Sequence, residues 1–223
     1  MLVWGCIFGV GDAMCTIAAA ICMNEPFDIL GKRMHIKQRR FSGDRFSDHI
    51  ALLSLFAEWS RVRENGTERE ESWCQQKDVN IQTLRMTWEA RRQLSEIMFN
   101  FGFPEEVLMP LELPNDLSDN RVDVIITLLS IALNPNFAIF VDGRKLIIDG
   151  KQALIHKSSV NCPFANKGVK FPFKSFVFGE KVRTRAVTAR QTTCVTPTQL
   201  ILTASNVKIE EGTGLEILVF QAR

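Results

Sequence analysis

The sequence has no tyrosine and only three histidines, so the side chains that most often carry chemistry near neutral pH are scarce. Each of His35, His49 and His156 stands alone, without a cysteine or carboxylate at metal-ligand spacing. The six cysteines form no C-x-x-C pair, and we expect them to be buried, reduced thiols of a cytosolic or nuclear protein. These scarcities disfavour a metal site in this chain.

An excess of charge of one sign is also missing. The 27 Lys and Arg residues face 25 Asp and Glu, which leaves a formal net charge of +2. The overall balance therefore indicates neither a nucleic-acid nor a membrane partner, and only local clusters of charge could do so. With 223 residues, 46% of them hydrophobic, the chain can bury a substantial core as one large or two small domains.

Two catalytic motifs are absent. No Gly-x-x-x-x-Gly-Lys-Ser/Thr phosphate loop occurs, and no Gly-x-Ser-x-Gly elbow presents a nucleophilic serine. His156 lies close to Ser158 and Ser159, but residues so near each other in a turn seldom align a base with a hydroxyl. We therefore expect binding rather than hydrolysis from this segment.

Residues 1–23 are apolar, with Asp12 as their single charge. A membrane span is disfavoured, because glycines interrupt the run and a central aspartate would cost about 2.5–3.5 kcal/mol in a bilayer. The pattern predicts a buried helix or helix pair instead. Because core-like sequence begins directly at Met1, we also expect that the natural protein has further sequence upstream.

The first half of the chain has mainly helical patterns. Apolar residues at helical spacing predict a helix over 48–63, capped by Ser47 or Asp48, and a second helix after an Asn80 cap that ends at Gly102. Between them, 67–72 reads as a polar insert. The basic stretch 31–48 is interpreted as a loop, and its cations between 32 and 45 either contact RNA or form a solvated face, the reading we favour. Arg85 and Arg92 are interpreted as residues that form salt bridges on the second helix rather than as RNA ligands.

The second half changes to β patterns after a short helix predicted near 122–133. Two Asp-Gly pairs, at 142–143 and 149–150, separate runs rich in Phe, Ile, Val and Leu, which is a strong hairpin signal. Further strands are predicted at 175–182, 184–189, 192–196, 199–204 and 215–221. The fold class is therefore α+β, with an N-terminal helical bundle followed by a small β-barrel.

The segment LIHKSSVN, residues 154–161, combines a cation, hydroxyls and amides that can hold phosphate and sugar without reading sequence. A polar turn that bonds only to itself is an equally good reading. The following strand region adds Lys181, Arg183 and Arg185, the last two on one face if that run is extended. On a small barrel such a basic face commonly binds single-stranded nucleic acid. The candidate binding residues are His156, Lys157, Ser158, Ser159, Asn161, Lys181, Arg183 and Arg185.

Several phrases resemble one family. Three phrases, IHKSSVNCPF, FVFGEKVRTRAV and VTPTQLILTAS, resemble the oligonucleotide/oligosaccharide-binding (OB) fold at the C-terminal end of DEAH-box RNA helicases. The first phrase carries Lys157, and in this it resembles the RNA helicase A/maleless branch of that family. GDAMCTIAAAIC, RFSGDRFSDHIALLSLFAEW and WCQQKDVNIQTLRMTWEARRQL resemble the helicase-associated helical domain that precedes this barrel. The resemblance predicts a helical domain over 1–115 and an OB-fold domain over 116–223.

The resemblance implies a parent protein that unwinds RNA, with ATP and Mg²⁺ bound to two RecA-like motor domains. It also implies single-stranded or partly duplex RNA and the motor domains as partners of this chain. The motor motifs do not occur in this sequence, so we expect no catalysis by this chain alone and no cofactor within it. In the family, the motor and the OB fold enclose the 3′ single strand, which implies that His156, Lys157, Ser158 and Ser159 face RNA, with Asn161 a weaker candidate. The nucleus is the implied location, and the cytoplasm a second one.

The sequence also departs from this family. Without tyrosine, a stacking role would fall to Phe or Trp, and the early C-terminus predicts an incompletely closed barrel with an exposed edge. An alternative function is a protein-interaction module that docks on a helicase motor or adaptor without binding RNA. A membrane protein anchored by 1–23 is a third, weaker reading.

Overall fold

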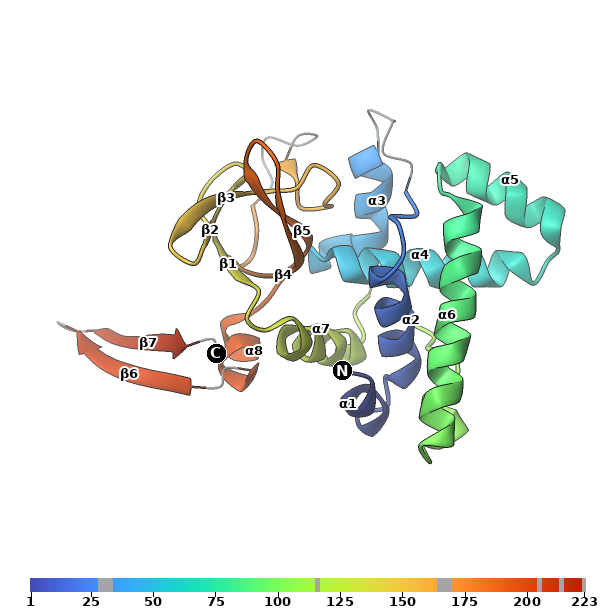
Figure 1. Cartoon of the computed structure of the whole chain (residues 1–223), viewed down its shortest axis with the longest axis horizontal. Helices are drawn as coiled ribbons and strands as arrows, with labels where there is room; N and C mark the ends of the chain where they lie inside the picture. Colours follow the sequence, from blue (N-terminus) through green and yellow to red (C-terminus); the bar gives the residue numbers. More distant parts are fainter. Residues whose placement is uncertain (28–33, 115–116, 164–169, 204–205, 213–214, 222–223) are drawn as a thin grey trace.

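The computed structural model describes residues 1–27, 34–114, 117–163, 170–203, 206–212 and 215–221, with the backbone alone for 34–37 and from 206 onward. A helical part and a β-barrel lie side by side (Figure 1). The predicted α+β class with an N-terminal helical part is confirmed.

The apolar start of the chain forms two helices, α1 (Leu2–Ile7) and α2 (Gly11–Ile21), as predicted. They approach closely because Gly5 has no side chain: a Cβ there would lie 2.7 Å from Cγ of Met14. The residues of α2 are mostly buried. Among the described helices none combines the length and apolar character that crossing a membrane requires.

Two polar segments are helical where the sequence patterns predicted none. Residues 34–42 of the supposed basic loop form α3 (Met34–Ser42), because Gln38, Phe41 and Ser42 share a face that is buried in the helical part. The supposed insert at 67–72 begins α5 (Thr67–Lys77). Its Glu70 is buried and accepts a hydrogen bond from the Trp59 indole, a contact that the polar pattern did not reveal.

The two predicted long helices are present as α4 (Asp48–Arg63) and α6 (Ile81–Asn100). Ser47 caps α4 by accepting from the Ile50 amide at 3.1 Å, and Asn80 caps α6 by accepting from the Thr83 amide at 3.0 Å. The predicted salt bridges of the two α6 arginines are also confirmed. They join Arg85 to Glu70 at 2.7 Å and Arg92 to Glu89 at 3.2 Å.

A buried ion pair ties α2 to α6. The Arg91 guanidinium donates from Nε to Oδ1 of Asp12 at 2.7 Å, and the Leu111 amide donates to Oδ2 at 2.9 Å. Arg91 also lies over the Trp88 ring, 5.2 Å from its centroid. Burial raises the pKa of Asp12, although the charge of Arg91 acts in the opposite direction. The carboxylate therefore depends on its partners to remain charged in the core.

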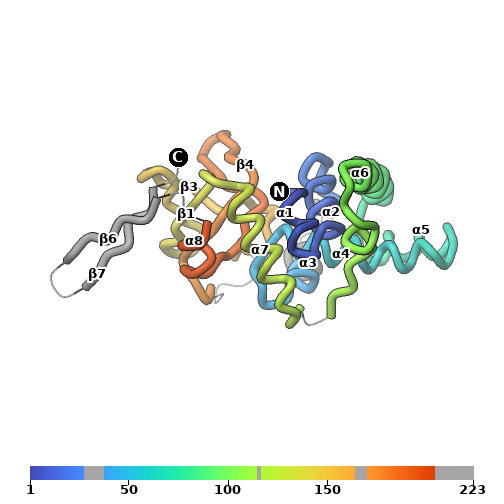
Figure 2. The backbone as a smooth tube through the Cα atoms, turned by 90° about the horizontal axis from the view of Figure 1, so that it is seen from below, coloured from blue at the N-terminus to red at the C-terminus, as the bar shows by residue number. Residues whose placement is uncertain are grey.

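After the short turn η2 (Glu105–Val107), the helix α7 (Asn120–Leu133) joins the helical part to the barrel. It lies between the two in Figure 2, and its buried residues share one hydrophobic cluster with Val10 and Ile50 of the helical part and Val177 of the barrel. The predicted domain boundary at 115–116 falls on residues outside the described ranges, so that division stays a prediction.

The barrel has five strands that close in the order β1-β2-β3-β5-β4, with only β3 and β5 parallel. Their bounds are β1 (Phe137–Phe140), β2 (Lys145–Ile148), β3 (Lys151–Ile155), β4 (Ser175–Arg183) and β5 (Val187–Cys194). Leu146, Ile155 and Phe176 are fully buried in its core. The prediction of an incompletely closed barrel is wrong, because closure is achieved before residue 195.

The β2–β3 turn and the segment after β5 test the remaining predictions of secondary structure. Asp149 and Gly150 both have positive φ, 50° and 70°, as the two-residue hairpin turn between β2 and β3 requires. The strand predicted at 199–204 is wrong, because α8 (Pro197–Thr203) occupies this segment. Thr196 and Gln199 cap it reciprocally: each side chain accepts from the other's backbone amide, at 3.1 and 2.9 Å. Beyond it, β6 (Asn206–Gly212) pairs with β7 (Leu215–Gln221), which confirms the strand predicted at 215–221.

The start of α4 meets β5 of the barrel through a buried polar contact. The Thr193 hydroxyl lies 2.7 Å from the Ser47 hydroxyl and 2.8 Å from Nδ1 of His49, and all three side chains are fully buried. Burial lowers the pKa of His49 to about 4. This imidazole is therefore neutral in the folded protein over most of the physiological pH range.

Replacing Arg91 by alanine should lower the free energy of unfolding by about 3–5 kcal/mol, because the Asp12 carboxylate is left buried without its cation. The neighbouring Arg92→Ala is the matched control, since it removes a pair that is exposed and contributes about 0–1 kcal/mol. Urea denaturation measures both variants. If both variants lose the same free energy of unfolding, the buried pair of Arg91 and Asp12 does not stabilise the fold more than the exposed pair.

Replacing His49 by asparagine should change how stability depends on pH. Between about pH 4 and 6.5 the unfolded chain binds a proton at His49 that the folded chain does not, so this stability is lost as the pH falls. Asparagine can still bond to Thr193 but does not titrate. The difference in unfolding free energy between wild type and His49→Asn should therefore rise from pH 4 to 6.5 and then level off. Denaturation at several pH values measures it, and a constant difference would contradict the buried neutral histidine.

Candidate functional site

The segment after β3 forms two successive tight turns against β5. The His156 amide donates to the Ala189 carbonyl at 2.9 Å, the Ser159 amide to the His156 carbonyl at 3.1 Å, and the Cys162 amide to the Ser159 carbonyl at 3.0 Å. Since Ala189 is also the cross-strand partner of Lys181 in β4, the start of the segment and Lys181 flank the same position of β5.

Three of the segment's polar side chains point into the protein. Ser158, Ser159 and Asn161 are 4%, 1% and 2% exposed, respectively. The Ser159 hydroxyl lies 2.9 Å from the Thr192 hydroxyl, and Nδ2 of Asn161 donates to the carbonyl oxygens of Phe46 and Thr192. In this conformation these groups shape the turn from inside, while Lys157 is the exposed side chain of the segment. Their predicted RNA contacts remain predictions.

Asp48, the first residue of α4, holds the segment and β5 from beneath. Its two carboxylate oxygens accept from the Val160 amide and the Thr192 amide, both at 2.7 Å. Burial raises the pKa of Asp48 to about 7, while these hydrogen bonds lower it. The sequence indicated Asp48 only as a cap candidate, because nothing in its neighbourhood along the chain revealed partners more than 100 residues away.

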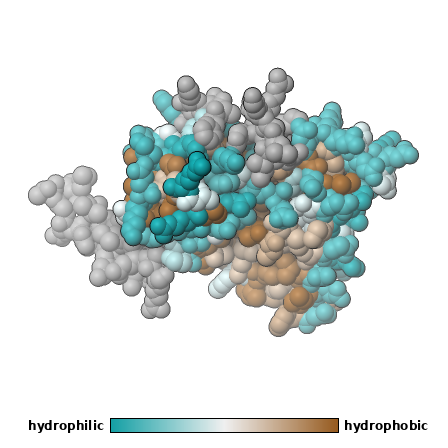
Figure 3. All heavy atoms as spheres, turned by 45° about the horizontal axis from the view of Figure 1, so that its top comes forward, coloured by the Kyte–Doolittle hydropathy of each residue, from teal (hydrophilic) through white to brown (hydrophobic). Residues whose placement is uncertain are grey.

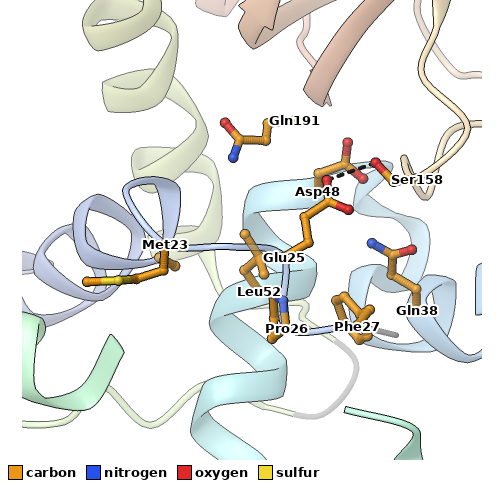
Figure 4. A pocket seen from close by; sticks show the side chains of 10 residues that line it. Met23, Glu25, Pro26, Phe27, Gln38, Asp48, Leu52, Ser158 and Gln191 are labelled. Atoms are coloured by element: carbon orange, nitrogen blue, oxygen red, sulfur yellow. Dashed lines mark hydrogen bonds between the residues drawn. The ribbon is translucent and has the colours of Figure 1, made fainter. Parts of the chain in front are cut away.

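Glu25, which follows α2, contacts the same segment through side chains. Its Oε1 accepts from the Ser158 hydroxyl at 2.8 Å and from Nη2 of Arg190 at 2.9 Å, and Arg190 also lies 3.5 Å from Glu180. In Figure 4 the Ser158 side chain points to the Glu25 carboxylate, next to that of Asp48. The cavity between them measures about 20 Å³, which is room for about one water molecule.

His156 is half-buried and has its Nδ1 2.7 Å from the Ser158 hydroxyl. Burial lowers the pKa of this imidazole, and the positive charge of Arg190 lowers it further, while Glu25 acts in the opposite direction. A neutral ring at pH 7 can take part in hydrogen bonds or stacking without adding charge. Among the described residues no group of three or more His, Cys, Asp or Glu side chains could hold a metal ion.

The other predicted cations lie on β4 and on the turn that follows it. Lys181, Arg183 and Arg185 are all exposed, and Nζ of Lys181 lies 2.8 Å from the Asp149 carboxylate. The proposed common strand face of Arg183 and Arg185 is wrong, because β4 ends at Arg183 and places Arg185 in the turn. In Figure 3 hydrophilic side chains cover much of the barrel, while apolar surface gathers on the helical part.

Comparison with known proteins agrees with this architecture. Residues 125–207 match the model of the oligonucleotide/oligosaccharide-binding (OB)-fold family. Over 98% of its length the chain is similar to the helicase DExH1 of Arabidopsis thaliana, at 29% identity, and to the DNA/RNA helicase DHX36 of Homo sapiens, at 25%. It is 26% identical to human DHX29 over 94% of its length.

The chain spans only 22% of the length of DExH1 and of DHX36, and 16% of DHX29. These relatives do not single out the RNA helicase A/maleless branch, so that narrower assignment stays a prediction. The helical part followed by a closed barrel, the matched OB fold and the helicase relatives lead to one conclusion. Over nearly its whole length the chain is similar to a part of DExH/DEAH-box RNA helicases, and its residues 125–207 match the OB-fold family.

Proposed function

We propose that the chain is an accessory region of an ATP-dependent RNA helicase and binds single-stranded RNA on its barrel. The observation that carries this proposal is a set of exposed cations on the segment after β3, on β4 and on the turn after β4, to either side of β5 in an OB barrel. They are Lys157, Lys181, Arg183 and Arg185. Cations of this kind neutralise phosphates without selecting a base sequence, which suits an enzyme that must move along RNA of any sequence.

The buried members of the predicted site have a supporting part in this proposal. Ser158, Ser159 and Asn161 fix the turn, so that Lys157 is presented at its outer side, next to the half-buried His156. A side chain already held near its bound position loses less conformational entropy on binding. The cations should then supply the affinity for RNA, and the buried hydrogen bonds should fix the conformation of the turn.

The helicase context extends the proposal beyond this chain. The relatives are named as ATP-dependent helicases and are several times longer, so ATP and Mg²⁺ would bind to other parts of such a protein. We place the barrel at the exit of the RNA path, packed on RecA-like motor domains, with single-stranded or partly duplex RNA as the ligand. The nucleus is the expected location, with the cytoplasm as a second.

A second candidate function is docking on the motor domains without any binding of RNA. Its support is an exposed apolar surface on α1, where Trp4 and Phe8 stack at 6.1 Å while each is more than half exposed. The apolar residues exposed on and after α6 include Ile97, Phe99 and Phe101. Surfaces of this kind commonly mark protein interfaces, and the rest of a helicase is the occupant that the relatives' length indicates.

Replacing Lys157 by glutamate should weaken binding of a single-stranded RNA oligonucleotide, whatever its sequence. The slope of log K against log salt concentration should also become shallower, by about 0.7 for each phosphate that the protein no longer neutralises. Fluorescence anisotropy at several salt concentrations measures both quantities. Arg69→Glu is the control, because it makes the same charge change at an exposed position of α5, on the far side of the helical part in Figure 1.

If Lys157→Glu and Arg69→Glu weaken RNA binding equally, the turn that carries Lys157 is not part of the binding site. A folded chain without salt-dependent RNA binding would contradict the RNA proposal itself. If that chain nevertheless captures separately expressed motor domains of a related helicase, the docking function is the one supported.

A further inference from the structure

We propose that Glu25 is a positioning residue for RNA binding, which acts by holding Ser158 and Arg190 and thereby fixing the turn that presents Lys157. The inference rests on the proposed function, because it concerns the same turn. It assigns a role in binding to a carboxylate of the helical part that lies more than 130 residues from the turn in the sequence.

The contacts of Glu25 explain why it acts on the turn. Its Oε1 accepts from Ser158, the residue next to Lys157, and from Arg190 in β5, the strand against which His156 is bonded. Its side chain is 15% exposed and that of Arg190 is 29% exposed, so water screens this pair only partly. Glu25 therefore links the turn to the strand that supports it through a single oxygen.

Two buried atoms near this oxygen have no hydrogen-bond partner within the described part of the chain. They are Oε2 of Glu25 and Nε of Arg190, an acceptor and a donor that belong to the same ion pair. A small rotation would convert the single contact into a two-bond pairing of guanidinium and carboxylate.

Glu25 differs from Asp48, although both carboxylates lie beneath the turn. Asp48 accepts from backbone amides of Val160 and Thr192 and is fully enclosed, so its loss would disturb the junction of α4 with the barrel. Glu25 contacts side chains of the turn and of β5. Its removal therefore tests positioning of the turn more selectively.

Whether removal of Glu25 weakens or strengthens RNA binding distinguishes a positioning role from a purely electrostatic one. Glu25 is a negative charge near the proposed phosphate path, and its removal also leaves Arg190 with the longer 3.5 Å contact to Glu180. Electrostatics alone would therefore make RNA binding stronger. If Glu25 positions the turn, its removal makes RNA binding weaker, because ordering the turn on binding then costs free energy.

The test is RNA affinity of Glu25→Ala in the whole 223-residue chain, measured by anisotropy with a single-stranded oligonucleotide. We expect affinity to fall about two- to tenfold, the range that corresponds to ordering one long side chain. Glu25→Gln keeps an acceptor for Ser158 and should restore most of the affinity. Glu96→Ala, an equal charge change at an exposed position of α6, is the control and should not weaken binding.

A double-mutant cycle with Lys157→Ala separates this inference from the proposed function. The loss of affinity caused by Lys157→Ala should be smaller in the Glu25→Ala background, because the lysine is no longer held there. Additive effects, or stronger binding by Glu25→Ala, would overturn the positioning inference. If Lys157→Ala has no effect in either background, the RNA site itself is absent and the proposed function fails first.

Thermal melting checks that each variant is folded. Should Glu25→Ala not fold, Ser158→Ala replaces it, since it removes only the hydroxyl that Glu25 holds. A folded Ser158→Ala that binds RNA as tightly as the wild type would overturn the inference equally.

Discussion

The contact between the start of α4 and the barrel is the constraint on which the rest of the structure depends. Within three consecutive residues, Ser47 bonds to Thr193, Asp48 bonds to the amides of Val160 and Thr192, and His49 bonds to Thr193. All of these groups are buried, so breaking any of these hydrogen bonds would leave a polar group unsatisfied. The register of β5 against the helical part is fixed by this requirement, and the turn that carries Lys157 is fixed with it.

Burial at this junction also determines its protonation chemistry. Asp48 and His49 are adjacent in sequence, yet burial moves their pKa values in opposite directions, to about 7 and about 4. In both cases burial disfavours the charged form. Between pH 4 and 6.5 the folded protein therefore tends to keep a proton at Asp48 and to lack one at His49, so their effects on stability oppose each other. The junction thus combines two buried groups whose protonation changes stability with opposite signs as the pH varies.

The helices that local patterns predicted correctly are those whose signals lie within one segment. Ser47 and Asn80 cap their helices with partners three residues away, and the Asp149-Gly150 turn needs only its own two residues. The helices and the strand that were predicted wrongly each have an identifiable cause. The polar composition of α3 and α5 concealed buried positions such as Gln38 and Glu70, and the β-rich composition of 199–204 outweighed the capping pair of Thr196 and Gln199.

For the candidate site, the sequence identified the turn but not the direction of its side chains. A run of His, Lys and Ser looks equally polar whether it faces solvent or the interior, and only packing turned Ser159 and Asn161 inward. The partners of these residues are distant along the chain: Glu25 is 133 residues from Ser158, and Asp48 is 112 residues from Val160. No local pattern encodes such pairs.

The sequence by itself determined the fold class, the main helices, the hairpins and the helicase family resemblance, because periodicity, caps and turn residues act over a few positions. Only the tertiary structure decided that the barrel closes, that Asp12 is paired with Arg91, and that a carboxylate after α2 supports the turn. The physical reason is that desolvation and hydrogen-bond satisfaction depend on which distant groups share one buried space.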